Sequence, residues 1–313
     1  MQALWIEDKE LSLRSVENPV AENEECLLDI LLVGICGTDL ELIKGYYDFT
    51  GIPGHEFVAI VVSGPEDLLG KRVVVDINLG CGSCLRCRMG IHKHCIQRKV
   101  IGIRDHPGAF AEQVVDPADN MLVVPDDVPD WQAVLVEPLA AAIQILEQVQ
   151  LNENSRVLIV GAGRLGKMIA RVLRALVDDL SVCVRTQIRR NGFDNSVMIV
   201  EPDGMGADFD CVIDCTGTET GLETALNAVK PRGQLFVKSA YRSDISINMN
   251  KIVVNEIELI GSRCGSMRTA LNWLTEDKVT FPDLTRVEYS LTDFIQAFKD
   301  AEDKAIEKVY LAP

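Results

Sequence analysis

The sequence predicts an α/β protein in two parts, in which a strand-rich N-terminal region precedes a doubly wound parallel sheet. The first ~125 residues contain short apolar or β-branched runs broken by turns. From Trp131 onward, strand-like runs alternate with segments that are apolar at helical spacing. Between the first strand and the first helix of that alternation lies a glycine-rich loop, Gly161 to Gly166. An alternation of this kind builds a parallel sheet covered on both faces.

Individual elements follow from the same patterns. In the N-terminal region, apolar runs bounded by glycine, proline or charge predict strands at residues 26–33, 57–62 and 71–76. Residues 133–151 are apolar at helical spacing and predict a helix. We expect the strands of the parallel sheet near residues 156–161, 181–185, 197–200, 210–214, 233–238 and 256–260.

The C-terminal residues predict two helices and a strand, at 268–276, 294–301 and 308–311. These pieces are too few for a separate domain, so we expect them to pack on the N-terminal region. The predicted divisions are therefore residues 1–130, 131–267 and 268–313.

Composition excludes several classes of function. A chain of 313 residues suits two ordinary domains, and its net charge of −16 would repel a phosphate backbone, which argues against a nucleic-acid partner. The N-terminus becomes charged almost at once, unlike a secretory signal, and no apolar run approaches the ~20 residues that span a membrane. Ten cysteines without an export signal indicate a reducing compartment. We expect a soluble cytoplasmic protein.

The strongest local signal is a group of four closely spaced cysteines: Cys81, Cys84, Cys87 and Cys95. Four thiolates at this spacing can surround one tetrahedral Zn²⁺. A closed four-sulfur site leaves no position for substrate, so this zinc would be structural. The alternatives are two disulfides or unrelated buried thiols, which the regular spacing in a chain without an export signal disfavours.

The glycine-rich loop predicts a dinucleotide site, because it follows a buried strand and opens a helix. Gly161 would permit the tight turn, Gly163 would let the pyrophosphate approach, and Gly166 would let helix and strand pack closely. The helix N-terminus would present free N–H groups to the phosphates. The alternative is a glycine turn without a ligand. The predicted cofactor-binding residues of this loop are Gly161, Gly163, Arg164, Leu165 and Gly166.

Cofactor selectivity depends on the residues that follow the second strand of the sheet. NAD-preferring sites usually carry a carboxylate there for the ribose 2′-hydroxyl, but this chain has Arg185, followed by Thr186, Arg189 and Arg190. Arginines suit a 2′-phosphate. We therefore expect Arg185, Thr186 and Arg190 to contact the cofactor, with NADP preferred and NAD possible. A basic, solvated loop is the alternative.

Three further motifs carry possible metal ligands. They are Gly34-Ile-Cys36-Gly-Thr38-Asp39, Gly54-His55-Glu56 and Val136-Glu137-Pro138. Each has an ordinary structural explanation: a buried thiol, a hydrogen-bonded core histidine and a helix-terminal acid. Together they offer sulfur, nitrogen and oxygen ligands, which suit a catalytic zinc with one open position.

The motifs, in this order before the glycine loop, resemble the zinc-dependent medium-chain alcohol dehydrogenases over essentially the whole chain. The resemblance is closest to the polyol, sugar and threonine dehydrogenase branch, where a glutamate stands at the Glu137 position. It implies a catalytic domain with a GroES-like β-barrel, a Rossmann cofactor domain and an active-site cleft between them. It also implies two zinc ions per chain, with the catalytic one on Cys36 and His55 and with Glu56 and Glu137 as direct or water-mediated ligands.

The resemblance further assigns a proton relay and the nicotinamide end of the cofactor site. Thr38 resembles the hydroxyl that starts the relay. Many relatives have a histidine where this chain has Glu41, so either Glu41 takes the proton or water replaces that step. Cys215, Thr216 and Gly217, after the fourth strand, would border the nicotinamide. Ala59 replaces a usual glycine, and the chain is shorter than most relatives.

The leading hypothesis is a zinc-dependent oxidoreductase that transfers hydride between NAD(P) and a secondary alcohol of a polyol, sugar or amino alcohol. The alternatives are a dehydrogenase of a larger biosynthetic intermediate (a pigment or natural product) and a non-catalytic sensor that binds zinc and NADPH. The expected partners are a small alcohol or carbonyl substrate and further copies of the chain. By analogy, a homodimer or homotetramer would form through the edge strand at residues 256–260.

Overall fold

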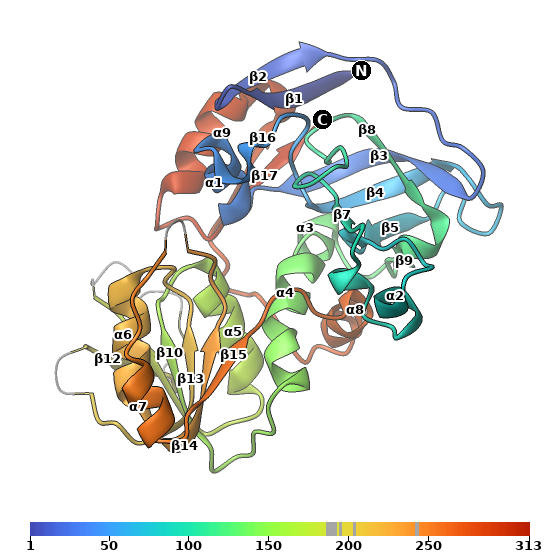
Figure 1. Cartoon of the computed structure of the whole chain (residues 1–313). Helices are drawn as coiled ribbons and strands as arrows, with labels where there is room; N and C mark the ends of the chain where they lie inside the picture. The colour runs from blue at the N-terminus through green and yellow to red at the C-terminus, as the bar shows by residue number, and fades with distance from the viewer. Residues whose placement is uncertain (186–192, 194–195, 203–204, 242–243) are drawn as a thin grey trace. The chain divides into compact units, whose positions relative to one another are not determined.

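The computed structural model describes residues 1–185, 193, 196–202, 205–241 and 244–313 (Figure 1). The chain forms two compact units. The N-terminal unit comprises Met1–Glu137, Met267–Glu276 and Thr285–Pro313. The parallel-sheet unit comprises Pro138–Ser266 and Asp277–Leu284.

A mainly antiparallel sheet organises the N-terminal unit. In the described residues it has seven strands, in the order β16-β17-β3-β4-β5-β9, with β8 also paired to β3. Buried and half-buried residues alternate along most of β3, because only one of its faces meets the core. The strands are β3 (Glu25–Gly34), β4 (Glu56–Ser63), β5 (Arg72–Val75), β8 (Gln113–Pro117), β9 (Met121–Val123), β16 (Arg286–Ser290) and β17 (Lys308–Ala312).

The C-terminal strand belongs to this N-terminal sheet. β17 pairs antiparallel with β3, where Tyr310 lies opposite Gly34 and Leu311 opposite Val33. The Ile35 N–H extends the contact by donating to the Val309 carbonyl at 2.9 Å. The last residues of the chain thereby reach the end of β3, where the Cys36 motif begins.

Shorter elements complete the N-terminal unit. A hairpin of β1 and β2 turns at Asp8 and Lys9, whose φ values of 51° and 67° are those of a tight hairpin turn. The short strands β6 and β7 pair beside the cysteine group. The elements are β1 (Gln2–Glu7), β2 (Glu10–Ser15), α1 (Gly37–Ile43), β6 (Asn78–Leu79), α2 (Leu85–Arg88), β7 (Lys99–Val100), α3 (Asp130–Ala133), α8 (Met267–Thr275) and α9 (Phe294–Glu302), with 3₁₀ turns at Tyr46–Asp48, His92–His94, Ala118–Asn120 and Leu291–Asp293.

The parallel-sheet unit confirms the predicted doubly wound sheet. Six described strands lie in the order β12-β11-β10-β13-β14-β15, and all neighbours are parallel. Leu158 and Val160 on β10 pack with Leu222 of α6 and Ile252 of α7, whereas Figure 1 shows α5 against the other face. The elements are β10 (Arg156–Val160), α5 (Arg164–Arg174), β11 (Asp179–Cys183), β12 (Met198–Val200), β13 (Phe209–Asp214), α6 (Glu219–Ala228), β14 (Val229–Val237), α7 (Met249–Val254) and β15 (Glu258–Gly261).

The prediction of one helix over residues 133–151 is wrong. The segment forms α3, α4 (Val136–Ile143) and a 3₁₀ turn at Gln144–Glu147. The physical reason is Pro138, which has no N–H to donate to the Val134 carbonyl four residues earlier, so the helical ladder is interrupted there.

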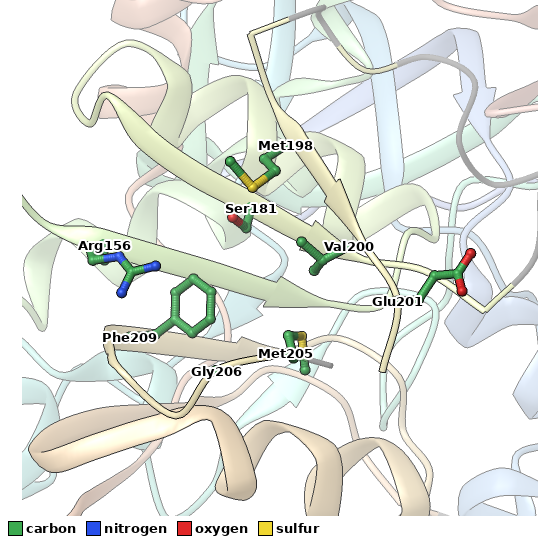
Figure 2. A pocket seen from close by; sticks show the side chains of 8 residues that line it. All are labelled: Arg156, Ser181, Met198, Val200, Glu201, Met205, Gly206 and Phe209. Carbon is green, nitrogen blue, oxygen red and sulfur yellow. The ribbon is translucent and has the colours of Figure 1, made fainter. Parts of the chain in front are cut away.

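A pocket borders one face of the parallel sheet near β11 and β12. The chain passes from β12 to β13 across two strands, and the described residues of 201–208 contain no helix. The pocket, of about 300 Å³, is lined by Arg156, Met198 and Phe209 among others (Figure 2). In the described part of the chain, no helix is long and apolar enough to cross a membrane.

Candidate metal centre and cofactor edge

Strand pairing brings the Cys36 and His55 motifs together. β3 ends at Gly34, which lies opposite Glu56 at the start of β4. Cys36 then forms the N-cap of α1, where its N–H donates to Asp39 Oδ2 at 2.8 Å. This bond fixes the entry into the helix and points the thiol toward the residues that open β4.

Three donor atoms from these motifs form one group. Cys36 Sγ, a ring nitrogen of His55 and a carboxylate oxygen of Glu56 all lie within 4.8 Å of one another. His55 and Glu56 are buried, with exposed fractions of 3% and 2%. Sulfur, nitrogen and oxygen in this arrangement fit a zinc ion that keeps an open fourth position.

Asp39 orients the histidine, a role that sequence reasoning missed. Its carboxylate is fully buried and lies 3.3 Å from His55 Nδ1, which leaves Nε2 for a metal. Burial alone would lower the pKa of His55, but the charges of Asp39 and Cys36 hold that pKa well above its usual value. Burial likewise would raise the pKa of the Cys36 thiol, yet His55 beside it lowers that pKa overall. The sequence signal for this role of Asp39 was its position at the end of Gly-Thr-Asp, three residues after Cys36.

Lys308 of β17 is a second residue that the sequence did not reveal. Its Nζ forms a buried ion pair with Glu56 Oε2 and lies 3.5 Å from the Ile35 carbonyl oxygen. Gly34 provides the room, because a Cβ there would fall 2.3 Å from Lys308 Cε. Burial lowers the pKa of Lys308 to about 8, against the opposing charges of Cys36 and Asp39. The lysine thus balances one carboxylate of the group.

The other predicted catalytic residues lie at different distances from the group. Thr38 Oγ1 is 3.8 Å from Cys36 Sγ. Glu41 lies on α1, partly exposed, with its carboxylate 3.7 Å from Lys44 Nζ. Glu137 is the second residue of α4, half-buried, and does not belong to the three-donor group.

The four clustered cysteines form the other group of possible metal ligands, and all are free thiols. Cys84 Sγ lies 3.6 Å from Cys87 Sγ and 3.8 Å from Cys95 Sγ. A tetrahedral zinc with Zn–S distances of about 2.3 Å requires sulfur separations of roughly 3.8 Å. The Ser83 hydroxyl donates to Cys81 Sγ, and this bond is the main cause that lowers the pKa of Cys81 to about 6. The geometry fits a closed structural zinc.

The glycine loop has the shape that a dinucleotide site needs. Gly161 has a φ of 107°, and a Cβ on Gly166 would fall 2.0 Å from the Gly161 carbonyl oxygen. Gly163 is the N-cap of α5, and a Cβ there would meet nothing within 4 Å. Arg164 and Leu165 form the first turn of that helix. The loop therefore leaves open space above a free helix N-terminus, which fits a pyrophosphate.

The remaining predicted cofactor residues lie at the carboxyl ends of neighbouring strands. Cys215 and Thr216 follow β13, and a Cβ on Gly161 would lie 3.1 Å and 3.0 Å from their atoms. Gly217 follows directly, with a φ of 64°. Arg185 is exposed just after β11. Thr186, Arg189 and Arg190 lie outside the described residues.

The chain is similar to known proteins, both to family models and to individual relatives. The family model for the alcohol dehydrogenase GroES-like domain matches residues 22–126, and the zinc-binding dehydrogenase model matches residues 188–276. The L-threonine 3-dehydrogenase of Pyrococcus abyssi is 30% identical over 77% of this chain and 76% of its own length. D-arabinitol dehydrogenase 1 of Uromyces fabae is 26% identical over 100% of this chain and 97% of its own.

Among solved structures, an alcohol dehydrogenase from E. coli CFT073 complexed with NADH superimposes with a TM-score of 0.91. It is 25% identical and covers 100% of this chain and 99% of its own. The identity with the threonine dehydrogenase extends over three quarters of both chains, and two domain models of the same family also match. Together these matches show the family to which the chain belongs. The chain belongs to the zinc-type medium-chain alcohol dehydrogenases, with a GroES-like domain and a Rossmann cofactor domain.

Proposed function

We propose that this chain is a zinc-dependent dehydrogenase that transfers hydride between NAD(P) and a secondary alcohol of a polyol, sugar or amino alcohol. The observation that carries the proposal is the buried group of Cys36, His55 and Glu56, which offers three donor atoms of different kinds within 4.8 Å. The names of the relatives, arabinitol and threonine dehydrogenases, support this substrate class.

In this proposal Cys36, His55 and Glu56 hold a catalytic zinc, directly or, for Glu56 and also Glu137, through water. When bound, Zn²⁺ supplies Lewis-acid chemistry that lowers the pKa of a substrate alcohol. Asp39 keeps the His55 ring oriented, and Lys308 balances the charge of Glu56. The four clustered cysteines hold a second, structural zinc, for two zinc ions per chain.

The Thr38 hydroxyl accepts the proton that leaves the substrate alcohol. Its oxygen is 3.8 Å from Cys36 Sγ, and a hydroxyl can accept one proton while it donates its own. Glu41 or water then takes the proton onward. A nicotinamide dinucleotide held at the carboxyl ends of the parallel strands would supply the hydride acceptor, so that oxidation of the alcohol to a carbonyl compound would be balanced by reduction of NAD(P)⁺ to NAD(P)H.

The dinucleotide belongs on the glycine loop and the carboxyl ends of the parallel strands. Gly161, Gly163, Arg164, Leu165 and Gly166 would receive the pyrophosphate. Arg185 at the end of β11 supports a preference for NADP, since a guanidinium suits a 2′-phosphate. Cys215, Thr216 and Gly217 would border the nicotinamide.

The assembly we propose is a homodimer or homotetramer in the cytoplasm. In the described sheet β15 is an edge strand, with Leu259 44% exposed, and Val253 and Val254 on the preceding α7 are 68% and 78% exposed. An apolar edge of this kind suits pairing with a second copy. Ten cysteines in the chain suit a reducing compartment.

The test is a screen of polyols, sugars and amino alcohols with NAD and NADP in parallel, followed by the absorbance of the reduced cofactor. We expect turnover with a secondary alcohol in the parent and none in Cys36→Ser or His55→Ala, with Cys264→Ser as the matched thiol control. Metal analysis separates the enzyme from a zinc-stabilised sensor, because two zincs per chain are expected for the enzyme and one for the sensor. Full activity in either ligand variant would refute the proposed site.

A further inference from the structure

A buried carboxylate lies where the strand order of the parallel sheet reverses. Asp214 ends β13 and is fully buried. β13 pairs with one edge of β10, whereas β11 and then β12 extend the sheet from the other edge of β10. In open parallel sheets, ligands bind beyond the carboxyl ends of the strands at such a reversal. Asp214 therefore stands directly beneath the expected cofactor edge, although the proposed function gives it no role.

Asp214 collects hydrogen bonds from two different loops. Its Oδ1 accepts from the Thr216 N–H at 3.0 Å and from the Thr216 hydroxyl at 2.6 Å. Its Oδ2 accepts from the Tyr241 hydroxyl, in the loop that follows β14. Burial, together with this bond to Asp214, raises the pKa of Tyr241, so its hydroxyl stays protonated and donates. One side chain thus ties the loop after β13 to the loop after β14.

The same two loops contact each other and the glycine loop. A Cβ on Gly217 would lie 3.1 Å from the Ala240 carbonyl oxygen. A Cβ on Gly161 would lie 3.0 Å from Thr216 Cγ2. On its other side Thr216 Oγ1 accepts from the Thr218 N–H at 3.2 Å, and Thr218 caps α6. A shift of Thr216 would consequently change the surface formed by all three loops.

We propose that the hydrogen bond from Tyr241 to Asp214 is a latch that positions the loops after β13 and β14 to bind the nicotinamide half of the cofactor. Tyr241 and Asp214 are positioning residues: they act through Thr216, Gly217 and residues 239–240 rather than by touching the reacting atoms. This inference rests on the proposed dehydrogenase function, because it presupposes a dinucleotide at this edge. It adds two residues that the glycine fingerprint does not contain.

The test is Tyr241→Phe, which removes the hydroxyl and keeps the ring. We expect the dissociation constants of NADH and NADPH, measured by fluorescence titration of the zinc-loaded protein, to rise about tenfold, the loss typical of one hydrogen bond to a charged group. ADP-ribose lacks the nicotinamide, so its affinity should stay at the parent value. With a substrate alcohol, KM for the oxidised cofactor should rise by a similar factor with kcat within about twofold.

Tyr289→Phe is the matched control, because the Tyr289 hydroxyl also donates to a carboxylate, that of Asp300, in the N-terminal unit. It should lower the melting temperature as much as Tyr241→Phe does and leave cofactor binding unchanged. Equal NADH binding by the parent and Tyr241→Phe would overturn the latch, as would an equal loss of ADP-ribose binding. A parent that binds neither NADH nor NADPH would instead refute the proposed function, and the latch with it.

Discussion

At the scale of single residues, the candidate metal centre depends on charges that compensate one another. Glu56 is almost fully buried, and its partner Lys308 is buried as well. Taking two charges out of water is costly, so each needs the other once both are buried. In the same way, the buried Asp39 carboxylate is the charge partner of the His55 ring.

In the zinc-free protein, Lys308→Met should therefore lower the free energy of unfolding by about 3–5 kcal/mol, because it leaves the Glu56 carboxylate buried without its partner. Adding Glu56→Gln should restore part of this loss, since the double variant buries no unpaired charge. Urea unfolding of the parent, both single variants and the double variant measures the coupling. Lys304→Met, at an exposed position in the same segment, is the control. Strictly additive effects of the two substitutions on the free energy of unfolding would show that Lys308 and Glu56 do not stabilise each other.

Asp116 makes stability depend on pH. It is fully buried on β8, with one hydrogen bond, from Asn120 at 3.3 Å, and burial holds the pKa of its carboxyl well above the usual value. A carboxyl whose pKa is higher in the folded state favours folding while protonated, and that stability is lost as pH rises from the unfolded pKa through the folded one.

Asp116→Asn should consequently raise the free energy of unfolding at pH 7 by about 1–3 kcal/mol. The gain should shrink on acidification and vanish below the unfolded pKa of about 4. Denaturant unfolding of parent and variant across this pH range checks the sign. Asp119→Asn, on the exposed turn beside it, should stay within about 0.5 kcal/mol at every pH. A pH-independent gain would point to packing and not to charge.

Arg185 bears on cofactor choice. A charge-assisted contact to phosphate is worth roughly 1.5–3 kcal/mol, so Arg185→Asp should weaken NADP by about ten- to hundredfold and favour NAD. The measurement is kcat/KM for both cofactors in parent and variant. Arg232→Asp, whose arginine side chain is 83% exposed in the same unit, provides the control. A parent that prefers NAD, unchanged by the substitution, would show that Arg185 is only part of a solvated face.

At the scale of elements, the cysteine group is a self-contained piece of the N-terminal unit. Its helix α2 has four residues, and β6 and β7 have two each. Elements this short bury little apolar surface of their own. Leu85, Met89 and Ile96 around them are all more than 60% exposed. A metal is therefore the expected source of order.

Cys84→Ser should lower the melting temperature by about 5 °C or more, because a structural zinc contributes folding energy directly. Metal analysis should show one zinc per chain in place of two. Cys264→Ser changes a thiol outside both groups and should alter neither quantity. A parent-like melting temperature and zinc content in Cys84→Ser would exclude a metal from this group.

At the scale of the whole molecule, the two edges of the described parallel sheet differ. β15 forms one edge and β12 the other, and each exposes an apolar side chain, Leu259 at 44% and Met198 at 60%. Among the described residues, the β15 edge continues into exposed apolar residues of α7, namely Val253 and Val254. The pairing surface proposed for the assembly is this edge.

Leu259→Glu should accordingly convert the assembly to monomers, because each copy would bring a charge into an apolar contact. Light scattering at micromolar concentration reports the mass. Met198→Glu on the opposite edge should leave the assembly intact. A parent that is already monomeric would refute the proposed assembly, and dissociation by Met198→Glu alone would move the interface to β12.

The sequence by itself determined what depends on neighbours along the chain. The cysteine group, the glycine loop between strand and helix, and the six parallel strands are local patterns, in which a few adjacent residues fix the backbone or the ligand set. Cys36 and His55 were also recognisable, since their motifs are distinctive even before β3 and β4 bring them together.

Only the tertiary structure decided which charges stand beside the candidate metal centre and what ties the cofactor loops together. Lys308 lies 273 positions from Ile35, and its place depends on β17 joining β3. The Tyr241 bond to Asp214 likewise depends on β14 lying next to β13. The physical reason is common to both: an ion pair or hydrogen bond between distant residues leaves no periodicity in the sequence, because strand pairing and not chain spacing sets the distance between its atoms.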